Sequence, residues 1–162
     1  MQRLIDTNLY VGNIGDLSLV NESDWAIVHA TQTIHYQYLG WNRTNKKPDK
    51  KHQNYILYEK NNHLSLNWVD GAAYLYNWSG PKTFTAILDF IDKWIITRKI
   101  LVHCDQGFSR SPTLCLLYLS KRIGNIANTS FGEAKTEFLR FYPGYRPGGI
   151  GDYVNANWDS IL

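Results

Sequence analysis

Short apolar runs alternate along this chain with longer stretches in which apolar residues recur every three or four positions. The short runs, typical of buried strands, lie at residues 9–11, 25–30, 55–59, 64–68 and 99–102. The stretches with helical spacing lie at residues 81–95, 111–122, 131–141 and 150–158. This alternation predicts an α/β fold in which helices flank a central, mostly parallel sheet of about four or five strands.

Two connections refine this prediction. Asn61-Asn62 separates two neighbouring strand runs and predicts a hairpin. The helix at 81–95 brings the chain to the strand at 99–102, which is the pattern of a right-handed crossover between parallel strands. A loop at 40–54 is polar and is long for a simple connector. We see no repeat, low-complexity tract or linker, and therefore expect one domain over residues 1–162.

The segment VHCDQGFSRSP, residues 102–112, stands where a strand ends and a helix begins. Pro112 suits the first turn of that helix, and Gly124 suits its end. The free backbone N–H groups of such a loop converge on an anion. Gly107 would allow the loop to curl so that these groups point inward. The segment therefore predicts a phosphate-binding loop.

The residues of this loop predict nucleophilic chemistry. A cysteine pKa falls from ~8.5 to roughly 3.5–7.5 at a helix N-terminus or beside a cation, and the resulting thiolate is a good nucleophile. Cys104 has both influences available, from the loop amides and from Arg110. The planar guanidinium of Arg110 can hold two phosphoryl oxygens, and the Ser111 hydroxyl can donate to the sulfur.

The segment resembles the signature His-Cys-x5-Arg-Ser of the cysteine-based protein phosphatases. Ser109 before the arginine and Ser-Pro after it are similar to the dual-specificity branch. Residues 5–13 (IDTNLYVGN), 24–31 (DWAIVHAT) and 114–120 (LCLLYLS) resemble the opening strands and the helix of that family. The resemblance implies substrate binding by the loop residues Asp105, Gln106, Gly107, Phe108 and Ser109. Gln106 departs from the alanine that is usual in the family.

Attack by a thiolate expels an oxygen leaving group, which a nearby acid should protonate. In the family that the chain resembles, this acid is an aspartate some thirty residues before the cysteine. Asp70 lies thirty-four residues before Cys104, directly after a strand run, and the resemblance implies that it is the general acid. The alternative role for Asp70 is that of a turn residue before Gly71. Asp89 and Asp92 fall on a helix, and the Asp105 side chain is expected to point outward.

The remaining histidines and cysteine have plainer interpretations. His103 can tune the Cys104 thiolate through a hydrogen bond from outside the pocket, whereas structural or surface roles are expected for the other histidines, His29, His35, His52 and His63. Cys115 lies among leucines and is interpreted as a core residue. The two cysteines do not form a disulfide framework, no Cys/His spacing indicates zinc, and the cysteine mechanism needs no metal or other cofactor.

Composition limits the class of protein. The chain has 162 residues, of which 44% are hydrophobic and 19% charged, as in globular proteins. The net charge of +3 does not by itself indicate nucleic-acid binding, but basic residues gather between Arg43 and Lys51. No apolar run follows Met1, and Leu114 to Leu119 is too short to span a bilayer. We therefore expect a cytoplasmic protein without a membrane partner.

Three functional hypotheses follow. The first is a phosphatase that acts on phosphotyrosine, and also on phosphoserine and phosphothreonine, through a cysteinyl-phosphate intermediate; its partner is a phosphorylated protein. The short chain favours a shallow pocket and hence the dual specificity. The second is an RNA 5′-triphosphatase or another hydrolase of non-protein phosphates, which the basic 43–51 stretch would support and which alone would involve nucleic acid. The third, which Gln106 favours, is a phosphate-binding module with little turnover.

Overall fold

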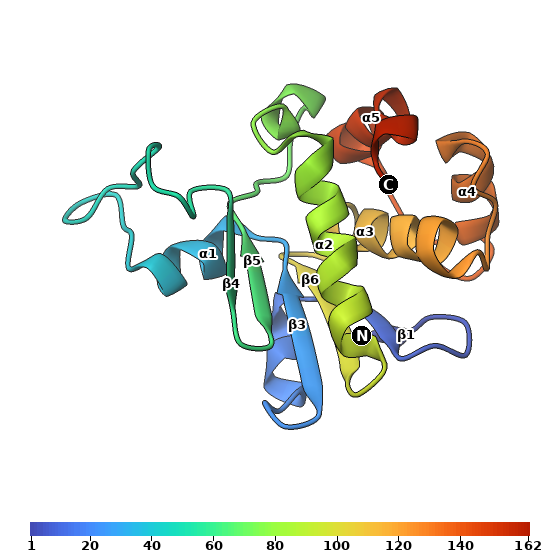
Figure 1. The fold of residues 1–162 in the computed structure, drawn as a ribbon, viewed down its shortest axis with the longest axis horizontal. Coiled ribbons are helices and arrows are strands. Elements are labelled where there is room, and N and C mark those ends of the chain that lie inside the picture. Colours follow the sequence, from blue (N-terminus) through green and yellow to red (C-terminus); the bar gives the residue numbers. More distant parts are fainter.

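A six-stranded sheet forms the centre of the computed structural model, which describes residues 1–162 (Figure 1). In spatial order its strands are β1 (Gln2–Arg3), β2 (Leu9–Asn13), β6 (Lys99–Cys104), β3 (Trp25–His29), β5 (His63–Leu66) and β4 (Leu57–Lys60). The four inner strands are parallel, and each edge strand is antiparallel to its neighbour. The prediction of a mostly parallel sheet is confirmed, as is the hairpin at Asn61-Asn62. The predicted number of strands was too low because the two-residue β1 has no apolar run.

Five α-helices and several single turns complete the fold. The helices are α1 (Gln32–Leu39), α2 (Gly80–Ile95), α3 (Arg110–Tyr118), α4 (Phe131–Phe138) and α5 (Gly148–Ala156). A π-helical turn, η3 (Leu119–Ile123), extends α3 as far as Gly124, as its spacing predicted. Helix α1 was not predicted, because its residues, QTIHYQYL, are mostly polar and aromatic. The Thr31 side chain starts this helix by accepting a hydrogen bond from the backbone of Thr33.

The two faces of the sheet differ in how they are covered. Residues along a strand point alternately to opposite faces. On β3, Ala26 and Val28 face the main core, which the sheet shares with α2, α3, α4 and α5. Trp25 and Ile27 face the other way and pack beside the single turn η1 (Ile14–Leu19). In the same alternation on β6, Cys104 belongs to the main core and Leu101 belongs to the smaller cluster.

The apolar face of α2, the helix that leads to β6, packs against this core. Phe84, Ile87, Leu88 and Ile91 are all fully buried, as their helical spacing predicted. Full burial of each such side chain contributes about 1.5–3 kcal/mol relative to exposure. This packing holds α2 across β6 and β3, and so fixes the path of the chain towards Cys104. None of the helices combines the length and the apolar character that crossing a membrane requires.

Candidate active site

The nucleophile candidate lies at the C-terminal end of the central strand. Cys104 is the last residue of β6, and α3 begins at Arg110. The backbone N–H of Gly107 donates to the Cys104 sulfur at 3.3 Å, and the Ser111 hydroxyl oxygen lies 3.2 Å from it. Gly107 has a φ of +79°, and a Cβ there would lie 3.1 Å from the carbonyl oxygen of Gly12. The loop thus curls around the sulfur as predicted, and glycine is required at this position.

Arg110 is anchored on three sides. One terminal nitrogen of its guanidinium donates to the carbonyl oxygens of Ala30 and Trp68, at 3.1 and 2.9 Å. The other donates to the Asp105 carboxylate at 3.3 Å. The Nε atom is buried and has no hydrogen-bond partner in the protein. Because only 4% of this residue is exposed, the unpaired donor is costly.

The prediction that Asp105 points outward is met only in part, because its side chain is 45% exposed at the cavity but its carboxylate is held by other residues. Its carboxylate pairs with Arg110 through one oxygen and accepts a hydrogen bond from the Thr31 hydroxyl through the other, at 2.6 Å. The buried guanidinium needs a compensating charge, and this requirement turns the side chain inward. Since Thr31 also caps α1, Asp105 joins the loop to the start of that helix.

A cavity of about 220 Å³ opens above the loop. Residues of three segments line it: Gln32 and Thr33 of α1, Trp68, Val69 and Asp70 after β5, and Cys104, Asp105, Gln106, Phe108, Ser109 and Arg110 of the loop. The predicted nucleophile, arginine and acid therefore share one cavity. Gly107, Ser111 and His103 are not among its lining residues. The contributions of Gln32, Thr33 and Trp68 were missed, because no local pattern marks residues brought in from other elements.

The backbone of Gly71 and Ala72, directly after Asp70, packs against the start of α5. A Cβ on Gly149 would lie 1.9 Å from the carbonyl oxygen of Gly71, so that only glycine allows this approach. Asp70 itself is exposed at the cavity wall. The close contact with α5 fixes the backbone that presents Asp70 to the cavity.

A cation–π contact and a hydrogen bond hold the residues at the rim of the cavity. The Phe108 ring is 43% exposed and lies under the guanidinium of Arg146, 5.0 Å from the ring centroid. The Ser109 hydroxyl donates to the carbonyl oxygen of Pro147 at 2.8 Å. Gln106 is exposed, so its long side chain is accommodated at the rim without entering the core.

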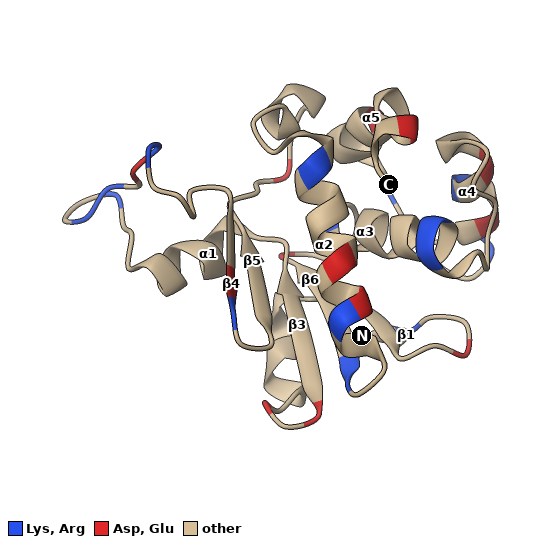
Figure 2. Ribbon diagram, viewed as in Figure 1, with Lys and Arg blue, Asp and Glu red and all other residues tan.

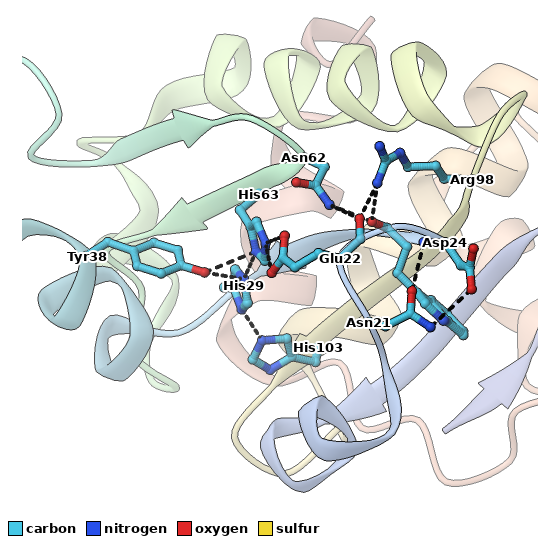
Figure 3. A network of polar contacts seen from close by, with 10 residues as sticks. Asn21, Glu22, Asp24, His29, Tyr38, Asn62, His63, Arg98 and His103 are labelled. Atoms are coloured by element: carbon cyan, nitrogen blue, oxygen red, sulfur yellow. Dashed lines mark hydrogen bonds and ion pairs between the residues drawn. The ribbon is translucent and has the colours of Figure 1, made fainter.

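His103 faces away from the cavity, on the opposite side of the sheet from Cys104. Its Nδ1 lies 3.3 Å from the Cys104 carbonyl oxygen, and its Nε2 lies 2.6 Å from His29 Nδ1 (Figure 3). Burial lowers the pKa of His103 to about 4 and that of His29 to about 2. His29 was expected to be merely structural. Its place at the end of a buried strand, like that of His103, was the one available signal of this contact.

Cys115 is fully buried in α3, as predicted for a core residue. Burial raises the pKa of its thiol well above the ordinary value. This second thiol is therefore kept protonated and out of contact with solvent.

Comparison with known proteins agrees with this geometry. No family model matches the chain. A stretch of 42 residues is 50% identical to human dual specificity protein phosphatase 5, and the rat protein matches to the same extent. This stretch is 24% of the chain and only 10% of the length of those relatives.

Several solved structures share the whole fold. DUSP15 has a TM-score of 0.60 at 17% identity, over 96% of this chain and 86% of that one. The human tyrosine phosphatase-like serine/threonine/tyrosine-interacting protein has a TM-score of 0.59 at 17% identity, over 95% and 92%. The Yvh1 phosphatase domain from Chaetomium thermophilum has a TM-score of 0.58 at 22% identity, over 96% and 92%. The chain has the fold of the dual-specificity phosphatases, which confirms the resemblance at the level of fold.

Proposed function

We propose that this protein is a cysteine-dependent phosphatase that hydrolyses phosphotyrosine, and also phosphoserine and phosphothreonine, in proteins. The main support is that Cys104, Arg110 and Asp70 line one cavity above the loop. A phosphoryl group bound there would lie beside the buried guanidinium of Arg110. It would also face the loop whose Gly107 N–H donates to the sulfur.

In the proposed reaction the Cys104 thiolate attacks phosphorus and the bond to the leaving oxygen breaks. Arg110 and the loop N–H groups hold the phosphoryl oxygens, on which charge gathers in the transition state. Asp70 gives its proton to the leaving oxygen, and the resulting carboxylate then accepts a proton from the water that attacks the cysteinyl phosphate. That attack breaks the S–P bond, releases inorganic phosphate and returns the sulfur as thiolate.

The test is hydrolysis of a small aryl phosphate in the presence of a chelator. Cys104→Ser and Arg110→Ala should abolish turnover, and Asp70→Asn should reduce it by about 10²-fold or more. Asp89→Asn is the matched control. Asp89 belongs to α2, does not line the cavity, and forms an exposed ion pair with Arg122. Wild-type protein that binds phosphate without turnover would refute the enzyme and favour a phosphate-binding module. Turnover unaffected by Asp70→Asn would assign the acid role to another group.

The rim favours an aromatic leaving group. Phe108 and Val69 both line the cavity and are exposed, so a phenyl ring finds apolar contacts there. Phe108→Ala should raise KM for a phosphotyrosine peptide by about tenfold, whereas KM for the matching phosphoserine peptide should change little. Equal effects on the two peptides would refute this account of the specificity.

The basic loop supports a second candidate function, hydrolysis of RNA 5′-triphosphates. Arg43, Lys46, Lys47, Lys50 and Lys51 are on an extended loop between α1 and β4 (Figure 2). The loop begins after Leu39, at the opposite end of α1 from the cavity-lining Gln32 and Thr33, so it would contact the distal part of a long substrate. Changing the four lysines to glutamine should remove triphosphatase activity and spare aryl phosphate hydrolysis. Wild-type protein without triphosphatase activity would exclude this candidate.

A further inference from the structure

A chain of hydrogen-bonded imidazoles runs from the surface to the residue before the nucleophile (Figure 3). His103 Nε2 lies 2.6 Å from His29 Nδ1, and His29 Nε2 lies 2.9 Å from His63 Nδ1. At the outer end, His63 Nε2 lies 2.8 Å from both carboxylate oxygens of Glu22. At the inner end, His103 Nδ1 lies 3.3 Å from the Cys104 carbonyl oxygen. Glu22, His63, His29 and His103 form what we term the histidine relay.

The register of the sheet brings the three rings together. His29 and His103 are directly opposite each other on the parallel strands β3 and β6. His63 is opposite Ile27 on β5, two residues before His29, so it reaches His29 diagonally. All three side chains are on the face away from the main core, beneath α1 and η1. The relay therefore follows from strand pairing and does not depend on a mobile loop.

Hydrogen atoms can be counted along the relay because both ends are oxygen acceptors. Four contacts separate the Cys104 carbonyl from the Glu22 carboxylate, and each requires one hydrogen. Three neutral imidazoles bring one N–H each. The fully bonded relay therefore holds one proton more than three neutral rings supply, and this proton balances the negative charge of the Glu22 carboxylate.

The Glu22 carboxylate sets the direction of the hydrogen bonds in the relay. The hydrogen bond from His63 lowers the pKa of Glu22, which keeps the carboxylate charged and able only to accept. Burial lowers the pKa of His29 to about 2 and that of His103 to about 4, which keeps both of these rings neutral. In the fully bonded arrangement, both buried rings have their hydrogen on Nδ1. Each then donates inward, and the last hydrogen bond ends on the Cys104 carbonyl.

Tyr38 partly compensates the relay for the loss of that proton. Its hydroxyl oxygen lies 3.1 Å from His29 Nε2 and 3.0 Å from His63 Nδ1. When the excess proton leaves the gap between these nitrogens, their direct hydrogen bond is lost, and the tyrosine hydrogen can turn to His29 Nε2 in its place. The tautomers of His29 and His103 then stay the same.

We propose that His29 and His63 are positioning residues for the nucleophile. With Glu22 they hold His103 in the tautomer that donates to the Cys104 carbonyl, and this hydrogen bond favours the Cys104 thiolate. This inference deepens the proposed function, because it rests on Cys104 acting as the nucleophile. It links the reactivity of the active site to a carboxylate on the protein surface.

Other charged and titratable groups lie beside the relay and influence where its protons reside. Arg98, before β6, donates to the Glu22 carbonyl oxygen, and Tyr58 and Lys60 of β4 lie beside His63. Asp16 of η1 and Asp105 of the loop favour a proton on His103, and Arg110 opposes one. Only Glu22 among the carboxylates contacts His63, so it is the group to change.

The experiment measures alkylation of Cys104 by iodoacetamide as a function of pH, since only the thiolate reacts. The side chain of Glu22 is 74% exposed, so Glu22→Gln should fold. It should slow alkylation about two- to fivefold below the midpoint of the titration. Glu59→Gln is the matched control, because Glu59 pairs with Lys93 at the surface outside the relay.

His29→Asn interrupts the relay and completes a double-mutant cycle. The asparagine amide can replace the Nδ1 donor to His103, but it does not extend to His63. Glu22→Gln should therefore have no effect on alkylation in the His29→Asn background. An unchanged rate in Glu22→Gln alone, or an equal slowing in both backgrounds, would overturn the proposal. Because alkylation requires no turnover, this result is independent of whether the protein hydrolyses phosphate.

A spectroscopic measurement on the unaltered protein gives a second criterion that does not depend on how the variants fold. Imidazole ¹⁵N shifts should show His29 and His103 as neutral rings protonated on Nδ1. A hydrogen on Nε2 of His103 would overturn the proposal.

Discussion

The hydroxyl oxygen of Ser111 lies 3.2 Å from the sulfur of Cys104. The same hydroxyl is placed to donate to the carbonyl oxygen of Gly12 at 3.0 Å. It has one hydrogen, so it cannot serve both acceptors at once. A protonated sulfur can donate to the hydroxyl oxygen, whereas a thiolate can only accept. Formation or release of the thiolate therefore turns the Ser111 hydrogen from Gly12 towards the sulfur.

Ser111→Ala should slow the breakdown of a cysteinyl phosphate more than its formation. The departing sulfur would lose a donor that stabilises its negative charge, at a cost of about 10²-fold in that step. Rapid-mixing kinetics with an aryl phosphate should then show a burst of leaving group followed by slow turnover. Ser120→Ala is the control, because the Ser120 hydroxyl donates to Ala127 at the far end of the same helical segment. Unaltered turnover without a burst in Ser111→Ala would contradict this role.

Asp105→Asn should broaden the range of substrates. The carboxylate is 45% exposed at the cavity and repels further phosphate groups on a substrate, although it also holds Arg110. We expect KM for an aryl phosphate to rise about threefold and KM for a polyphosphorylated substrate to fall. Asp49→Asn, in the basic loop, provides a control for the change in net charge. Parallel changes of KM for both substrates would argue against selection by Asp105.

Only one of the two cysteines should react in the folded protein. Burial raises the pKa of the Cys115 thiol well above its usual range and also shields the sulfur from reagent. Mass spectrometry after brief treatment with iodoacetamide should show a single added group, and none in Cys104→Ser. Modification of Cys104→Ser at a rate near that of the unfolded chain would show that α3 opens readily.

Stability should fall as the solution becomes acidic. The pKa of His29 is lowered from 6.5 to about 2 and that of His103 from 6.5 to about 4, so between pH 6.5 and 4 the unfolded chain binds more protons than the folded one. The stability that the neutral rings contribute is fully present above pH 6.5. It is lost as the pH falls towards 4 for His103 and towards 2 for His29.

Urea unfolding at a series of pH values measures this effect. Each ring adds up to about 1.4 kcal/mol per pH unit to the slope of the free energy of unfolding below pH 6.5. His29→Asn should reduce the slope by about that amount, whereas His52→Asn, at an exposed loop residue, should leave it unchanged. An equal slope in wild type and His29→Asn would mean that His29 is protonated in the folded protein.

Site residues that lie close together in the sequence could be predicted from the sequence alone. Cys104, Gly107 and Arg110 fall on one turn between a strand and a helix, and local geometry alone brings them around an anion. The apolar face of α2 and the hairpin at Asn61-Asn62 were likewise visible as periodicity and turn chemistry. The assignment of Asp70 as the acid remains a prediction, although the structure places it at the same cavity.

Contacts set by strand pairing could not be predicted. His29 and His103 are 74 residues apart, and only the register of β3 against β6 makes them neighbours. The inward turn of Asp105 depends on Thr31, which comes from another strand end. Helix α1 has little apolar periodicity, and its place follows from the Thr31 cap and from packing against β5. Such features depend on tertiary structure, which overrides local propensity.

Arg110 belongs to α3, yet it donates to the carbonyl oxygens that follow β3 and β5, Ala30 and Trp68. An anion held by its guanidinium would therefore be fastened to three segments that separate when the chain unfolds. By mass action, such a ligand raises the melting temperature, and a hundredfold excess over Kd adds about 2.7 kcal/mol to the free energy of unfolding. Inorganic phosphate, the product of the proposed reaction, would then serve as a thermal stabiliser of the folded chain.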